Sequence, residues 1–133
     1  RKSSGTDYPT TKKPRTRDAN LASRDRIELL IDLDRDWTTY YRLVIDHRGW
    51  TYDACGSVAA WNPKWFVAAA ADDEHWTCEA AIPFRELTSR NPQTKSAWAV
   101  GIQRIVPRVG FQSWTQPAGP DILPEGFGYV KFE

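Results

Sequence analysis

The 133-residue sequence contains no methionine, two histidines and two cysteines. Cys55 and Cys78 are too few for a disulfide framework, and the pattern leaves open one bridge or two buried free thiols. His47 and His75 lie far apart in the chain, and no third ligand at zinc spacing accompanies them. No run of about 18 apolar residues occurs, which excludes a membrane-spanning helix.

Motifs that carry catalytic chemistry are also scarce. The sequence has no G-x-S-x-G nucleophile elbow and no glycine-rich phosphate loop. These absences favour a protein that binds a ligand over one that catalyses a reaction.

The small net charge of +1 hides an uneven distribution. Residues 1–17 carry six basic residues against Asp7, or +5, and the remainder carries 12 basic and 16 acidic residues, or −4. We therefore expect a basic flexible leader over 1–17 and one folded domain over 18–133. The leader has no aromatic residue besides Tyr8, and the acidic domain repels phosphate, so we expect no nucleic-acid partner.

Aromatic residues are abundant: seven Trp, five Tyr and five Phe make up 13% of the chain. They favour strands, and several segments show the period-two alternation of half-buried strands. Strands are expected at 26–33, 39–46, 50–55, 64–71, 76–82, 97–106, 111–115 and 127–132. One helical turn is expected at 83–87, with Pro83 at its first position. Eight short strands with almost no helix predict an all-β, antiparallel β-sandwich.

Several phrases of the sequence support a family resemblance. They are Asp25-x-x-Glu28-Leu-Leu-Ile-Asp32, Tyr40-Tyr41-Arg42-Leu43-x-Ile45-Asp46-x-x-Gly49, Trp76-Thr77-Cys78-Glu79-Ala80-Ala81-Ile82-Pro83-Phe84, Trp98-x-x-Gly101-Ile102-Gln103-Arg104, Ser113-Trp114 and Phe127-Gly128. Their order and spacing resemble the family 9 carbohydrate-binding modules over roughly 18–133. Those modules are jelly-roll-like β-sandwiches, commonly attached to secreted bacterial enzymes that degrade polysaccharides.

The resemblance implies a non-catalytic carbohydrate-binding module, monomeric within a larger multidomain protein that acts in cellulose- or xylan-type polysaccharide catabolism. It implies an extracellular, cell-surface or periplasmic location and a poly- or oligosaccharide partner, with no membrane partner. Family members usually have further strands before the Asp25 phrase, so we expect an N-terminally shortened sandwich. The segments 21–24 and 120–123 stand where sugar-binding members have two clamping tryptophans. A structural or interaction domain that has lost sugar binding therefore stays open as an alternative.

Aromatic residues in loops and at strand ends are the candidate ligand contacts, because flat aromatic faces match the apolar C–H faces of sugars and polar neighbours supply hydrogen bonds. The candidate ligand-binding residues are Trp61, Trp65, Trp37, Trp50, Trp114, Asn62 and Arg104. For most of these tryptophans, a place in the core is the stronger expectation.

Asp32, Asp34 and Asp36 resemble the start of a calcium loop, since calcium prefers several carboxylate oxygens at close range. Trp37 and Leu43 stand where an EF-hand has its glycine and its glutamate, so an EF-hand is excluded. A structural calcium ion, with further oxygens from residues such as Asp18 and Asp25, and a solvated acidic turn both remain open, and the latter is favoured. No cofactor is required.

Glu28 and Glu79 lie within strands that the family pattern places in one sheet. Two carboxylates within reach of each other form the acid–base pair of a glycoside hydrolase, which is a remote alternative. We expect instead that they pair with Arg42 and Arg104.

Overall fold

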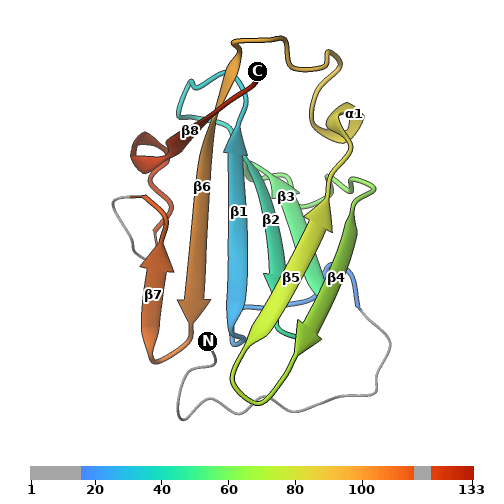
Figure 1. The fold of residues 1–133 in the computed structure, drawn as a ribbon, viewed down its shortest axis with the longest axis vertical. Coiled ribbons are helices and arrows are strands. Elements are labelled where there is room, and N and C mark those ends of the chain that lie inside the picture. Colours follow the sequence, from blue (N-terminus) through green and yellow to red (C-terminus); the bar gives the residue numbers. More distant parts are fainter. Residues whose placement is uncertain (1–15, 116–120) are drawn as a thin grey trace.

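A computed structural model describes residues 16–115 and 121–133, so most of the predicted basic leader lies outside the described residues. The described chain forms two antiparallel sheets with almost no helix, which confirms the all-β sandwich (Figure 1). The elements in chain order are β1 (Arg26–Asp32), β2 (Tyr41–Asp46), β3 (Thr51–Cys55), β4 (Phe66–Ala71), β5 (Trp76–Ala81), α1 (Phe84–Leu87), β6 (Ala97–Val106), β7 (Gly110–Ser113), the 3-10 turn η1 (Pro124–Gly126) and β8 (Gly128–Lys131).

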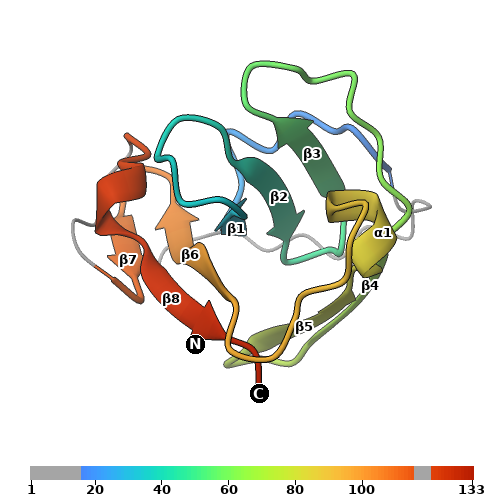
Figure 2. The same ribbon diagram turned by 90° about the horizontal axis from the view of Figure 1, so that it is seen from above.

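The larger sheet has the strand order β3-β2-β1-β6-β7, and β8 pairs with the opposite end of the same β6 edge. The smaller sheet consists of β4 and β5, which pair with each other. Figure 2 shows this hairpin as a second layer opposite the larger sheet, with α1 at its end. Within residues 16–115 and 121–133, no helix is long and apolar enough to cross a membrane.

The strand predictions agree closely with the structure. The expected strand 97–106 has the observed bounds of β6, and the other seven are found with their ends shifted by one or two residues. Pro83 occupies the N-cap position just before α1 and not the first helical position, and its backbone is extended. The turn η1 was not predicted, because Pro and Gly within 117–126 indicated only a loop.

The alternating side chains place an apolar row on each of β1, β2 and β6 in the larger sheet. Leu29 stands opposite Leu43 on β2 and Ile102 on β6, so these three side chains share one face, here called the inner face. The inner face packs toward the β4–β5 layer, where Ile31, Leu43 and Leu87 form a buried cluster. Partly buried residues complete this core: Leu29, Leu33, Tyr41, Trp61, Trp65, Ile82 and Trp98.

The opposite, outer face of the larger sheet is partly covered by the segment 16–22, which Figure 2 shows on the side away from β4 and β5. Ala19 and Leu21 pack against Val44 in a second buried cluster. The Thr51 N–H donates to the Thr16 carbonyl (3.2 Å), and the Ala19 N–H donates to the Thr51 carbonyl (3.1 Å). Thr16, the first described residue, and Ala19 are thus both hydrogen-bonded to β3.

Carboxylates occupy an unusual share of the interior. Five of them are 0–2% exposed: Asp25, Glu28, Asp32, Asp46 and Asp53. Buried charges are costly unless they are paired, and each of these accepts hydrogen bonds from side-chain or backbone donors. Two of the donors are indole N–H groups: Trp76 donates to Asp25 (3.1 Å) and Trp65 donates to Asp53 (2.9 Å).

The two cysteines are free and half-buried, on β3 and β5. Burial raises the pKa of the Cys55 thiol and of the Cys78 thiol above their ordinary value. The structure therefore matches the second alternative, two free thiols with little thiolate character.

Candidate ligand-binding site

One row of side chains crosses four strands on the outer face. Gln103 on β6 stands opposite Glu28 on β1, Glu28 opposite Val44 on β2, and Val44 opposite Tyr52 on β3. Residues opposite one another on neighbouring strands have side chains on the same face. The row therefore forms a continuous floor that changes from polar at Gln103 to aromatic at Tyr52.

Glu28 lies at the centre of this floor and is fully buried. Its Oε1 accepts from Arg26 Nε (2.7 Å) and Arg42 Nη2 (2.8 Å), and its Oε2 accepts from Arg42 Nε (3.0 Å) and Gln103 Nε2 (3.3 Å). Burial raises the pKa of Glu28, but the hydrogen bonds and charges of Arg42 and Arg26 together outweigh burial and hold the pKa below its ordinary value of 4.5. Glu28 is therefore ionised at neutral pH.

The segment before β1 forms one wall above this floor. Arg26 Nη1 donates to the carbonyl of Ala22 (2.9 Å), which fixes the segment to the ion network. The Ala22 N–H in turn donates to the side-chain oxygen of Asn20 (3.1 Å). Arg26 therefore links the wall to the carboxylate of Glu28.

A cavity of about 290 Å³ lies between this wall and the floor. Its lining residues are Asp18, Ala19, Asn20, Leu21, Ala22, Arg26, Arg42, Val44 and Tyr52. The guanidinium of Arg42 lies over the ring of Tyr52, 5.9 Å from its centroid. This size is at the lower end of ligand pockets in proteins, and an apolar lining with a few convergent polar groups is typical of them. We call it the outer-face pocket.

Three of the predicted ligand-binding tryptophans serve mainly to build the structure. The ring of Trp61 packs against Tyr41 with centroids 4.6 Å apart, and Trp65 lies in the same inner core. Trp50 packs against the cluster under segment 16–22, and the guanidinium of Arg48 covers its ring at 3.7 Å. These placements match the expectation that most of the tryptophans contribute to the core.

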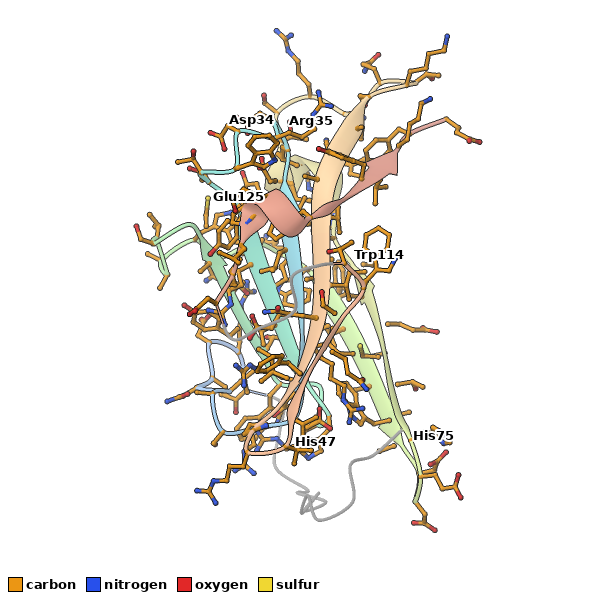
Figure 3. All side chains as sticks on the ribbon, turned by 90° about the vertical axis from the view of Figure 1, so that its left-hand side faces the viewer. Asp34, Arg35, His47, His75, Trp114 and Glu125 are labelled. Carbon is orange, nitrogen blue, oxygen red and sulfur yellow. The ribbon has the colours of Figure 1, made fainter. Side chains whose placement is uncertain are left out.

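Trp37 and Trp114 are more than half exposed, at 51% and 56%. Trp37 lies in the loop after β1, and Trp114 follows β7. The Trp114 ring packs against Gly128, and a Cβ added to Gly128 would lie 3.0 Å from this ring. Gly128 pairs with Val100, so Trp114 belongs to the inner face and not to the outer-face pocket. Figure 3 shows the labelled Trp114 side chain projecting from the sheet.

The two polar candidates are also separated from that pocket. Asn62 is exposed in the loop between β3 and β4. Arg104 donates to both oxygens of buried Asp25, from Nε (2.9 Å) and Nη2 (2.6 Å). Since Asp25 also accepts from Trp76 on β5, the Arg104 side chain helps to join the two sheets.

The expectation that Glu28 and Glu79 share a sheet is wrong. Glu28 is on β1 of the larger sheet, whereas Glu79 is on β5 of the smaller one and is exposed. Only half of the expected ion pairing is found: Arg42 binds Glu28, but Arg104 binds Asp25. The four bonds to the Glu28 carboxylate also occupy the oxygens that an acid–base catalyst needs.

Asp32, Asp34 and Asp36 do come together, with carboxylate oxygens within 4.8 Å of one another. Asp32 is buried and accepts from the backbone N–H groups of Arg35 (2.8 Å) and Trp37 (2.9 Å). Burial raises the pKa of Asp32, and the neighbouring Asp34 raises it further, while the two backbone donors lower it. The cluster has the oxygen ligands that calcium prefers, and the same oxygens shape the loop.

The two histidines lie at one end of the molecule, away from Asp34 and Arg35 at the other (Figure 3). Among the described residues, the three aspartates are the only cluster of potential metal ligands. His47 is buried, and burial lowers its pKa, with a further decrease from Arg48 and an opposing increase from Asp46.

A comparison with protein-family models, curated proteins and solved structures found no match to this chain. The sequence does not predict the outer-face pocket, because most of the candidate ligand contacts that it offers are tryptophans. Its signal is present but faint: Arg26, Glu28, Arg42 and Tyr52 all occupy the polar phase of alternating strands. That phase indicates solvent exposure until the register shows that these residues meet.

Proposed function

We propose that this chain is a non-catalytic carbohydrate-binding module and that the outer-face pocket receives the sugar. The observation that carries the proposal is the combination of a cavity of monosaccharide scale with Tyr52 and Arg42 among its lining residues. Sugars combine apolar C–H faces with a rim of hydroxyl groups, and the pocket offers both kinds of surface. The resemblance to family 9 modules supports the same class of ligand.

The proposal extends to the biological setting that this resemblance implies. The chain would act within a larger secreted protein in the catabolism of cellulose- or xylan-type polysaccharides, outside the cell, on its surface or in the periplasm. Glu79 lies in the other sheet from Glu28, and this separation supports a binding role over the remote hydrolase alternative.

The test is calorimetric titration of the protein with cello-, xylo- and uronic-acid-containing oligosaccharides. Ala22→Leu adds bulk from an exposed position in the pocket wall and leaves the backbone carbonyl that binds Arg26 in place. We expect this variant to bind at least about tenfold more weakly than the wild type, a loss of about 1.4 kcal/mol. Trp114→Ala is the matched control, and its affinity should be unchanged.

Absence of binding to every oligosaccharide at millimolar concentration would refute the proposed function. Loss of binding in Trp114→Ala with full binding in Ala22→Leu would retain a carbohydrate-binding role but place the sugar on the inner face.

A second candidate function is a docking domain without sugar binding. Ile102, Trp114 and Val130 favour it, because all three are exposed apolar side chains toward the β6–β8 end of the inner face (41%, 56% and 39%). Under this alternative, the isolated chain binds no glycan and Trp114→Ala weakens association with a protein partner.

A further inference from the structure

We propose that the sugar recognised by the outer-face pocket carries a carboxylate, so that its ligand class is the hexuronic acid residues of acidic glycans. This inference rests on the proposed function and narrows it, because a pocket for neutral sugars needs no excess of positive charge.

The first argument is the charge balance of the pocket floor. Arg26 and Arg42 each carry a positive charge, and among the described residues Glu28 is the one carboxylate with which they form ion pairs, which leaves one positive charge in excess at the floor. Their side chains are 12% and 33% exposed, so water screens this charge less than it would on an open surface. Asp18 also lines the pocket, but it is exposed, so solvent screens its charge more strongly.

The second argument is the kind of hydrogen-bonding capacity that remains. Glu28 already accepts four hydrogen bonds, so it offers little to a ligand hydroxyl. Arg42 has five N–H donors and uses its Nε and one Nη2 donor on Glu28. Within residues 16–115 and 121–133, no acceptor is bonded to its Nη1. The floor of the pocket therefore presents donors, which suit a ligand rich in acceptors.

The third argument is geometry. A guanidinium that binds Glu28 through Nε and Nη2 still presents its Nη1 and Nη2 end, and this end can bind a second carboxylate through two parallel hydrogen bonds. The same guanidinium lies over the ring of Tyr52, 5.9 Å from its centroid. The apolar side chains of Ala19, Leu21 and Val44 are placed beside it to contact the body of a sugar ring.

The experiment compares charged and neutral sugars that are otherwise alike. Galacturonate and galactose, and glucuronate and glucose, are titrated into the ¹⁵N-labelled protein, and amide shifts are followed at Ala22, Val44 and Tyr52. We expect each uronate to bind at least about tenfold more tightly than its neutral partner, the difference that charge-assisted hydrogen bonds confer. We also expect the uronate affinity to fall as salt concentration rises.

Two variants connect this preference to the pocket. Arg42→Lys keeps the charge but loses the planar fork that serves two carboxylates, and should reduce uronate affinity about tenfold with little change for neutral sugars. Ala22→Leu should weaken both classes. Trp114→Ala should retain the uronate preference.

The outcomes separate the two proposals. Equal or tighter binding of the neutral sugars at Ala22, Val44 and Tyr52 overturns the acidic-ligand inference and leaves the carbohydrate-binding function standing. Uronate binding that leaves these three amides unshifted also overturns the inference. Binding of neither class, in the wild-type protein, overturns both.

Discussion

At the scale of single residues, two buried carboxylates help to fix the positions of two tryptophans. Asp25 and Asp53 each accept an indole N–H, from Trp76 and Trp65. An indole has one donor and needs a partner when it is buried, and a carboxylate away from water needs donors. Each group therefore satisfies the other, and this pairing draws both indoles away from the surface.

The Glu28 network should be the most sensitive polar site in the protein. Glu28→Gln leaves two guanidiniums without their shared partner, and we expect a decrease of about 3 kcal/mol in the free energy of unfolding at pH 7. The measurement is urea unfolding followed by circular dichroism. Glu79→Gln is the matched control: Glu79 is exposed on β5, and its loss should change stability by less than about 0.5 kcal/mol.

Glu28 should also contribute to acid unfolding. Its pKa in the folded protein lies below the ordinary value of 4.5, so its stabilising effect is complete above pH 4.5 and is lost as pH falls through the folded-state pKa. The wild type should therefore lose stability below pH 4.5 more steeply than Glu28→Gln. Parallel stability curves for the two proteins would show that Glu28 does not titrate in this way.

At the scale of elements, the central position of β1 contrasts with the isolation of the β4–β5 hairpin. β1 is paired on both sides, by β2 and β6, whereas β4 and β5 pair only with each other within the described residues. The side chains of the hairpin are also mostly exposed, apart from Trp76. Fewer pairings and less burial mean a lower free energy of local opening.

Hydrogen exchange should show this difference directly. We expect the amides of β1 and β2 to exchange slowest, through global unfolding, and those of β4 and β5 to exchange at least about tenfold faster. Mass spectrometry or NMR at several denaturant concentrations measures both. Equal protection in β1 and β5 would show that the two layers open as one unit.

The acidic loop after β1 provides an element-scale test for calcium. Both oxygens of Asp32 already accept backbone N–H groups that define the loop, so the loop can hold its shape without a cation. We expect millimolar calcium, or its removal by EDTA, to shift Tm by less than about 2 °C. A larger rise with calcium, abolished in Asp34→Asn, would instead establish a structural calcium site.

Strand positions were predictable because each strand carries its own alternation, as Ile27 to Leu33 illustrates. The assignment of strands to sheets was not, and the separation of Glu28 from Glu79 is the clearest case. Which strands pair depends on contacts between segments distant in the chain, and the period-two pattern of β5 is compatible with either sheet. The outer-face pocket could not be predicted for the same reason. Tyr52 and Glu28 are brought to one row only by the register of β1, β2 and β3.

At the scale of the whole molecule, packing and polar contacts join the two layers, and the two cysteines form no covalent bond between them. Asp25 binds Arg104 of the larger sheet and Trp76 of the smaller one, while both cysteines remain thiols. We therefore expect a reducing agent to leave Tm unchanged within about 1 °C. Cys55→Ser tests the same point, and a reductant-dependent Tm that disappears in this variant would reveal a disulfide.

The exposure of Trp114 has an optical consequence. Of the seven indoles, Trp37 and Trp114 are the two more than half exposed, so they should account for most of the fluorescence that acrylamide can quench. In Trp37→Phe, the quenchable emission would come mainly from Trp114. A sugar that enters the outer-face pocket leaves this indole accessible, whereas a protein that covers Ile102 and Val130 shields it. A single quenching curve would thus report which face of the larger sheet binds the partner molecule.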